Sequence, residues 1–518
     1  MRLKLKEINF GKIDAYNEYL TSGDEIFKKS FYCHPSLQFD KIMNGEIYYI
    51  CGNKGTGKTM LLKYIELKLK ECPTENIIQF VRFKKDIDET DRNEIKRVSV
   101  PLNGFEEVVE KDIPSDNSIN SVLAWEVYLI KIIVKLIEKS EFGIFDRYDD
   151  NWLKLQRLID LIYKDDESSI HKILPKVKRG KVEIDIAKIL KLGIDVEWDS
   201  TDKTGVPFNN LAKKIISLYG CLKPSSCKLF ILIDELELSL NKNKSYDRDI
   251  TLIRDLVIAV QYLSEESKVH NFSIYFIAAI RNEVYKHLLS SGMEINKPIN
   301  DFGVQITWQQ KGGNIGEHPL IQMIEQKIAV SEKKNDIIST NLWKNYFATF
   351  VHSTPIKKYI LDQTWLKPRD IIRLFNLMQK HFPDKDFIDQ ACFDTIRQQY
   401  SEECWTELAE ELRVKYTNNE VEGIKHCLLG LRLPFSTKDF ERQIEEKSTM
   451  FESVECIKKR EKNINFILKD LYDVGIIGNY RPGRFYFMGE FDFNPTNELT
   501  IHYPLQKFFK TTKKCFNK

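Results

Sequence analysis

Residues 52–59 have the types and the spacing of a loop that binds phosphate groups. They form a complete G-x-x-x-x-G-K-T pattern, Gly52-Asn53-Lys54-Gly55-Thr56-Gly57-Lys58-Thr59, called the GKT loop below. Glycines let the backbone wrap closely around phosphate oxygens, and a helix that follows points its amide groups at the negative charge. In this pattern Lys58 reaches the β- and γ-phosphates and the Thr59 hydroxyl ligates Mg²⁺. We therefore expect a bound nucleotide and Mg²⁺, contacted by the GKT loop and by Met60.

A second chemical group follows the apolar run 229–233, which ends in Asp234 and Glu235. A buried strand would deliver Asp234 to its carboxyl end, where this carboxylate can hold Mg²⁺ through water. Glu235 is then placed to orient or deprotonate an attacking water. Alone, such a run can simply end in a solvated turn; together with the GKT loop it predicts nucleotide hydrolysis. A water acceptor also argues against a small-molecule kinase, whose acceptor is a bound substrate.

Five short apolar runs must position these groups, and they lie at 47–51, 77–83, 229–233, 274–280 and 304–308. Helical patterns separate them, including one at 61–69 directly after the GKT loop. Strands that alternate with helices predict an α/β fold with a parallel sheet covered on both faces. We expect this core to span 46–320, interrupted by a helical insertion at 84–205. The basic run 172–181 within the insertion is a solvated face or a phosphate-backbone contact.

The order of these motifs resembles the AAA+ and STAND classes of P-loop ATPases, which implies ATP as the ligand. In that class the strand after the Asp-Glu strand ends in a residue that senses the γ-phosphate, which here is Arg281, with Asn282 behind it. The segment 365–373 is similar to the lid helix of the origin-recognition and STAND branches. The resemblance implies that Pro368 touches the base or ribose and that Arg369 is the second sensor arginine, in a helical lid at 321–400.

Two features depart from the AAA+ pattern. Lys58 and Asp234 are 176 positions apart, because the insertion lies between them. AAA+ rings also carry an arginine that acts on a neighbouring subunit from just before the last strand, but 288–303 contains no arginine, only Lys297. Arginine is favoured for clamping a transferring phosphoryl group, so catalysis across a ring interface is in question. Arg248 or Arg254, after Asp234, could substitute.

The last segment, 401–518, resembles a winged helix, with helices predicted near 403–415, 419–430, 437–447 and 462–474 and a hairpin whose tip is 481–484. Its candidate recognition helix, 463–472, offers Asn463, Asn465 and Lys469 to DNA but also carries Asp470. Residues 436–518 hold 15 Lys and Arg against 12 Asp and Glu. Because each neutralised phosphate needs a cation, double-stranded DNA could bind through this helix, Arg481, Arg484 and the basic tail (Lys507, Lys510, Lys513 and Lys514). Packing on the ATPase is the alternative.

The order of all these parts also resembles a family of bacterial P-loop ATPases with a winged-helix tail that occurs in mobile and phage-defence loci. The shared residues are Phe10-Gly11, Asn53-Lys54-Gly55 and the segment 471–478. We expect residues 1–45 to pack on the nucleotide site.

The composition limits the remaining possibilities. The 518 residues suggest three or four domains, and 78 Lys and Arg against 76 Asp and Glu give a net charge of +2. This balance excludes a globally basic nucleic-acid binder. The ten cysteines are scattered without a C-x-x-C pair, and no apolar run reaches the ~18 residues of a membrane span. We expect a cytoplasmic protein without a membrane partner.

These observations predict an ATP-hydrolysing switch of AAA+/STAND type that couples its nucleotide state to oligomerisation, DNA or an effector protein, in the setting of phage defence. A nucleotide-gated scaffold or DNA-binding module with negligible hydrolysis is the alternative. A homo-oligomer is the expected assembly.

Overall fold

A computed structural model describes residues 2–98, 119–140, 143–163, 171–178, 180–196, 205–236, 244–290, 295–309, 314–460, 464–481, 484–486, 493–496 and 498–510. Its centre is a five-stranded parallel sheet in the order β2–β6–β7–β1–β8. The strands are β1 (Tyr49–Gly52), β2 (Asn76–Arg82), β6 (Lys228–Leu236), β7 (Ile274–Arg281) and β8 (Gly303–Gln305). The predicted α/β class with a parallel sheet is confirmed, and each strand lies within about two residues of an apolar run.

Alternate residues of each strand enter two different cores, because successive side chains of a strand point to opposite faces. Phe230 and Leu232 of β6 belong to the core that contains helix α4 (Lys58–Leu69) and the N- and C-terminal segments. Ile231 and Ile233 belong to the core that contains α7 (Ser121–Lys139) and α11 (Lys244–Val269). Both faces of the sheet are therefore covered, as near-continuous apolar strands require.

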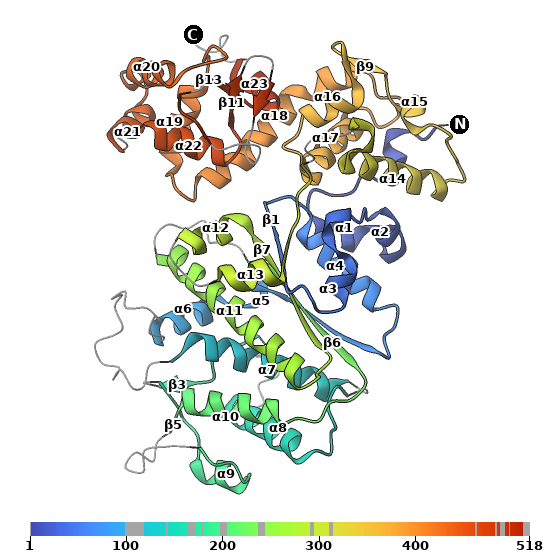
Figure 1. The fold of residues 1–518 in the computed structure, drawn as a ribbon. Coiled ribbons are helices and arrows are strands. Elements are labelled where there is room, and N and C mark those ends of the chain that lie inside the picture. The colour runs from blue at the N-terminus through green and yellow to red at the C-terminus, as the bar shows by residue number, and fades with distance from the viewer. Residues whose placement is uncertain are drawn as a thin grey trace.

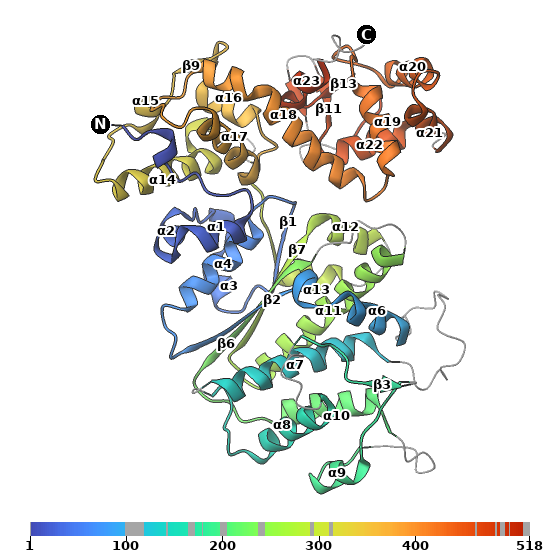
Figure 2. The same ribbon diagram turned by 180° about the vertical axis from the view of Figure 1, so that it is seen from behind.

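The predicted insertion at 84–205 is helical, but it forms one layer of the core (Figures 1 and 2). The buried α7 packs on α11 and on α10 (Phe208–Gly220), and α8 (Asp150–Tyr163) packs on α10. Short helices α5 (Phe83–Asp86), α6 (Glu89–Val98) and α9 (Ile186–Lys191) accompany them. The segment also contributes to a small antiparallel sheet of β3 (Val177–Lys178), β4 (Lys181–Val182) and β5 (Val206–Pro207). The basic run 172–181 thus contains β3 and the first residue of β4.

The N-terminal segment forms α1 (Ala15–Ser22), α2 (Asp24–Ser30) and α3 (Phe39–Met43), beside α4. Its first turn, η1 (Leu5–Glu7), packs on α17 (Pro368–His381), whose Gln379 donates hydrogen bonds to the carbonyls of Leu5 and Ile8. Helices α12 (Asn282–Ser290) and α13 (Asn296–Phe302) connect β7 to β8. After β8 come α14 (Pro319–Lys334), α15 (Leu342–Tyr346) and α16 (Ile356–Asp362), with the short strands β9 (Phe350–Val351) and β10 (Thr354–Pro355).

The C-terminal segment begins within a single long helix, α18 (Gln390–Leu412), so the boundary placed between residues 400 and 401 falls inside that helix (Figure 1). Next come α19 (Asn418–Leu428), α20 (Thr437–Ser448), α21 (Glu452–Arg460) and α22 (Ile464–Asp473). β11 (Ile477–Arg481) pairs with β12 (Arg484–Tyr486) as a hairpin and with β13 (Glu498–Ile501), before α23 (Tyr503–Lys510). The predicted helices and hairpin are present; α21, β13 and α23 were not predicted. Among the described helices, none is long and apolar enough to cross a membrane.

Candidate functional site

The GKT loop joins the end of β1 to the start of α4, which begins at Lys58. Gly55 and Gly57 have φ angles of +81° and +97°, a region that residues with a Cβ rarely adopt. A Cβ at Gly55 would also lie 3.1 Å from the Cβ of Arg369. Trp308 holds the loop from the other side, because its indole Nε1 donates to the carbonyl of Thr56 at 2.9 Å. The positive φ angles, the close approach of Arg369 and the Trp308 hydrogen bond together fix the loop in the curved backbone conformation that the glycine spacing predicts.

The Lys58 side chain is buried and folds back on the loop. Its Nζ donates to the carbonyl oxygens of Gly52 at 2.7 Å and Asn53 at 2.9 Å. Burial disfavours the charged ammonium and, with the nearby positive charge of Arg281, lowers the Lys58 pKa to about 8. A bound anion would offset both effects, so the site favours negative charge next to Nζ.

Asp234 and Glu235 lie near the carboxyl end of β6, where the pairing with β7 shifts register between Ile233 and Leu236. Glu235 has a φ of +62°, which is uncommon for a residue with a Cβ. A bulge of this kind re-aims the side chains next to it, and the apolar run gave no sign of it. Asp234 is buried, and burial followed by the neighbouring Asp234 charge raises the Glu235 pKa above its ordinary value.

Arg281 ends β7, which lies between β1 and β6 in the sheet. Its Nη1 lies 3.3 Å from a carboxylate oxygen of Glu283. The next residue, Asn282, contacts the GKT loop directly: its Nδ2 donates to Oδ1 of Asn53 at 2.8 Å and its Oδ1 accepts from Gln305 at 3.0 Å. Position 282 is therefore the polar link between the end of β7 and the GKT loop.

Pro368 and Arg369 open α17, as expected for a proline in the first turn of a helix. Arg369 Nη1 lies 2.8 Å from Oε1 of Glu407 on α18. Its Nε is buried and has no hydrogen-bond partner among the residues that the structure describes. A buried guanidinium nitrogen without a partner is unfavourable, and an anion beside the GKT loop would supply the missing acceptor.

One cavity of about 260 Å³ brings these groups together. Among the residues predicted to act in the site, it is lined by Lys54, Gly55, Thr56, Gly57, Lys58, Thr59, Met60, Asp234, Glu235, Arg281, Pro368 and Arg369. Gly52 and Asn53 do not line it; their carbonyls lie behind the loop, on Lys58. Residues 12–16, Glu18, 30–32 and Leu37 form another part of the wall. The N-terminal segment therefore packs on the site.

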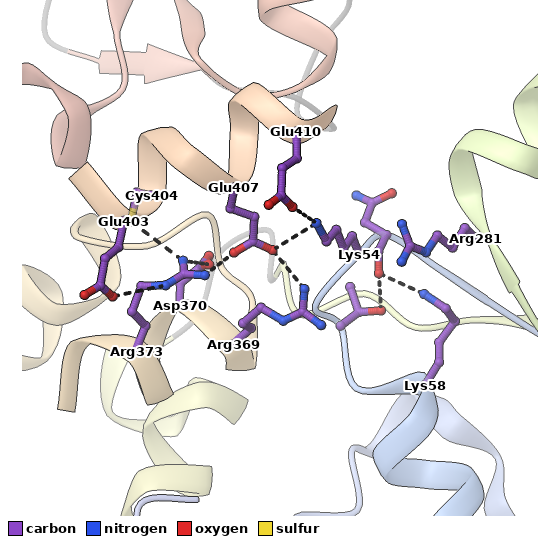
Figure 3. Close-up of polar contacts among 12 residues, drawn as sticks. Lys54, Lys58, Arg281, Arg369, Asp370, Arg373, Glu403, Cys404, Glu407 and Glu410 are labelled. Carbon is purple, nitrogen blue, oxygen red and sulfur yellow. Dashed lines mark hydrogen bonds and ion pairs between the residues drawn. The ribbon is translucent and has the colours of Figure 1, made fainter. Parts of the chain in front are cut away.

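Several contacts around the site had no signal in the sequence. Lys54 Nζ lies 3.3 Å from Glu410 and 3.8 Å from Glu407, both on α18 (Figure 3). Arg82 of β2 lies opposite Asp234 in the sheet, lines the cavity and pairs with Asp86 at 3.0 Å. These pairings join segments with no shared motif.

The two arginines considered as trans-acting groups are not available for that role in this conformation. Arg248 is 2% exposed and pairs with Asp249 at 2.7 Å, and Arg254 is 6% exposed and pairs with Asp255 at 2.5 Å. Arg248 also contacts Glu89, at 3.5 Å, and Asn93, so it joins α11 to α6. Neither presents its guanidinium to a second subunit.

The candidate recognition helix α22 has two different faces. Asn465, Phe466 and Lys469 are exposed, whereas Asp470 accepts from Lys415 at 2.5 Å and from the Tyr416 hydroxyl at 2.8 Å. Lys507 and Lys510 of α23 are exposed too. The side chains of Arg481 and Arg484, and residues 463, 513 and 514, lie outside the described part of the chain.

The fold and the cavity define an α/β protein with a five-stranded parallel sheet, consistent with a P-loop-like fold, and with a C-terminal helical region. Residues 318–409 match the model of the FunZ-associated C-terminal helical domain. This segment runs from the start of α14 to the last turns of α18 and includes the predicted lid at 321–400. No curated protein matches the sequence.

Proposed function

We propose that the chain is an ATP-binding and ATP-hydrolysing switch of AAA+/STAND type. The single observation that carries this proposal is the shared cavity. The GKT loop, the Asp234-Glu235 pair, Arg281 and the first turn of α17 all line it, although they come from four distant parts of the sequence.

The residues fit ATP and Mg²⁺. The GKT loop and the start of α4 offer amide groups to phosphates, and the buried Lys58 and the unpartnered Nε of Arg369 offer positive charge. The Thr59 hydroxyl and the Asp234 carboxylate are oxygen donors of the kind that Mg²⁺ prefers, and this ion ordinarily keeps several waters. Mg²⁺ would neutralise charge on the β- and γ-phosphates. Pro368 would contact the base or ribose.

Glu235 would act as the general base. Burial and the Asp234 charge raise its pKa, which increases its affinity for a proton taken from water. Arg281 and Arg369 would respond to the γ-phosphate from β7 and α17. Loss of that phosphate on hydrolysis would change the contacts of both elements, and this change would be the switch.

The decisive test compares two variants with matched surface controls. We expect Lys58→Ala to abolish binding of Mg-ATP in calorimetry, and Glu235→Gln to bind ATP like the wild type but to release no phosphate. Lys68→Ala and Glu71→Gln, on the exposed end of α4 and just after it, should behave as the wild type. Full turnover by Glu235→Gln would contradict the assignment of the base.

The buried Arg248 and Arg254 favour a second candidate, a nucleotide-gated scaffold or DNA-binding module with negligible hydrolysis. Without an arginine from a second subunit, transition-state charge is less well stabilised. Turnover measured over a series of protein concentrations, with and without duplex DNA, separates the two functions. A flat rate near zero in every condition favours the scaffold, and a rate that rises steeply with concentration favours catalysis in an oligomer.

We further propose that the switch controls assembly of the chain or engagement of an effector protein, in the setting of phage defence that the motif order suggests. The mass in solution of Glu235→Gln with ATP and Mg²⁺ tests the first outcome. Contact with double-stranded DNA through α22 and α23 is a further option, supported by the exposed Asn465, Lys469, Lys507 and Lys510. A salt-dependent affinity for duplex DNA, lost on replacing Lys469 and Lys507, would support it.

A further inference from the structure

Two carboxylates of α18 hold the cations that face the cavity (Figure 3). Glu407 accepts from Arg369 at 2.8 Å and also binds Arg373, while Glu410 lies 3.3 Å from Lys54. Lys54 and Arg369 line the cavity, whereas Glu407 and Glu410 do not. The carboxylates therefore neutralise, from outside, the two cations that a phosphate group inside the cavity would contact.

Glu407, whose side chain is 16% exposed, forms ion pairs with both Arg369 and Arg373. Burial of this carboxyl raises its pKa, but the charges of Arg373 and Arg369 outweigh burial and lower the pKa to about 2. Glu407 is thus anionic at neutral pH. An anion on α18 and a polyphosphate in the cavity would lie on opposite sides of Lys54 and Arg369, where they repel one another and compete for the same donors.

Helix α18 also connects this contact to the C-terminal segment. The Ser401 hydroxyl donates to the carbonyl of Pro504, and Trp405 packs edge-to-face on Phe509 with ring centroids 5.3 Å apart. A rigid helix carries displacement along its length, because its backbone hydrogen bonds are internal. A movement of α18 away from the GKT loop would therefore move α23.

We propose that Glu407 and Glu410 form an anionic latch, which holds α18 on Lys54 and Arg369 in the absence of nucleotide. A nucleoside triphosphate that enters the cavity displaces this latch. The latch rests on the proposed function, since it requires a polyphosphate in the cavity. Phosphate binding opens the contact between α18 and the GKT loop, and the opening is transmitted to residues 418–510. By linkage, weakening the latch strengthens nucleotide binding by the same factor.

The latch is tested by calorimetry with the non-hydrolysable ATP analogue AMP-PNP and Mg²⁺ on the full chain. We expect Glu407→Gln to bind AMP-PNP about fivefold more tightly than the wild type or better, the lower end of ordinary coupling between sites. Glu403→Gln is the matched control: it lies one turn earlier on α18, where its carboxylate accepts from Gln399 at 3.0 Å and lies 3.9 Å from Arg373. Its affinity should equal that of the wild type.

Hydrogen exchange of α18 and α23 provides a second measurement. We expect AMP-PNP to speed exchange in these helices of the wild type, and Glu407→Gln to show the faster exchange without nucleotide. If Glu407→Gln fails to fold, Glu410→Gln carries the test, because the Glu410 side chain is 45% exposed and lies 3.3 Å from Lys54. We then expect about twofold tighter binding, a smaller effect because Glu410→Gln leaves Glu407 on Arg369 and Lys54.

The possible failures are distinguishable. Unchanged or weaker AMP-PNP binding by a folded Glu407→Gln, or equal tightening by Glu403→Gln, overturns the latch and leaves the ATPase proposal standing. If the wild type binds no AMP-PNP, the proposed function fails and the latch is overturned with it.

Discussion

The protonation state of Lys58 gives a prediction that depends on the tertiary structure rather than on the motif. Burial and then the charge of Arg281 lower its pKa to about 8, whereas Glu283, Asp234 and Cys51 act in the opposite direction. Only the ammonium form can donate a charge-assisted hydrogen bond to a phosphate. Nucleotide affinity should therefore fall as the pH rises through 8.

The expected size follows from the titration. With a pKa of about 8, the protonated fraction of Lys58 is about 0.9 at pH 7 and about 0.1 at pH 9. If the unprotonated form binds phosphate negligibly, the dissociation constant of Mg-ADP rises about tenfold between these values, which is about 1.4 kcal/mol of binding free energy. A lysine with its ordinary pKa of 10.5 would change affinity by only a few per cent over the same range.

Calorimetric titration of Mg-ADP into the chain at half-unit steps from pH 7 to pH 9 measures this dependence. Lys58→Arg is the matched control, because a guanidinium stays charged throughout this range. Its binding is expected to be weaker, since arginine differs from lysine in geometry, but independent of pH. A flat profile for the wild type, or the same slope in both proteins, would refute the assignment of the dependence to Lys58.

Three further outcomes follow from the contacts of the site. Turnover should fall on acidification at a pH above the ordinary carboxyl range, because burial and Asp234 raise the pKa of Glu235, the proposed base; Glu235→Gln should lower the rate about 100-fold or more in a phosphate-release assay. Arg373→Ala should lower the free energy of unfolding in denaturant by about 1.5–3 kcal/mol, because it removes the less exposed of the two arginines that pair with Glu407. Arg369→Ala should weaken ATP binding with a smaller loss of stability, and equal losses in the two variants would contradict this division. Glu18→Gln should cost about 3–5 kcal/mol in the same unfolding assay, because it strands the buried Lys327, which lies 2.9 Å from the Glu18 carboxylate; Glu25→Gln on exposed α2 is the neutral control.

Helical residues of the insertion 84–205 form part of the core. The sequence predicts that 84–205 interrupts the α/β core, but in the structure α7 packs on α11 and its residues join the core beneath one face of the sheet. Much of the long sequence between Lys58 and Asp234 therefore forms a layer that covers one face of the sheet. A parallel sheet needs both faces covered, which gives the inserted residues a structural role in the core.

The sequence by itself determined the features that depend on short spacing. The GKT loop, the apolar run before Asp234-Glu235 and the proline at the start of α17 each lie within about ten residues. Local backbone geometry and side-chain alternation dictate their form. For the same reason the five strands and most helices lie where the apolar periodicity placed them.

Only the tertiary structure decided which distant charges meet. Glu407 reaches Arg369 and Lys54, Asn282 reaches Asn53, and Trp308 holds the Thr56 carbonyl. The bulge that turns Glu235 and the burial that lowers the Lys58 pKa also arise from packing. These contacts follow from the strand order β2–β6–β7–β1–β8 and from the way α17 and α18 close over the loop. No local pattern encodes them, because they join segments separated by up to hundreds of residues along the chain.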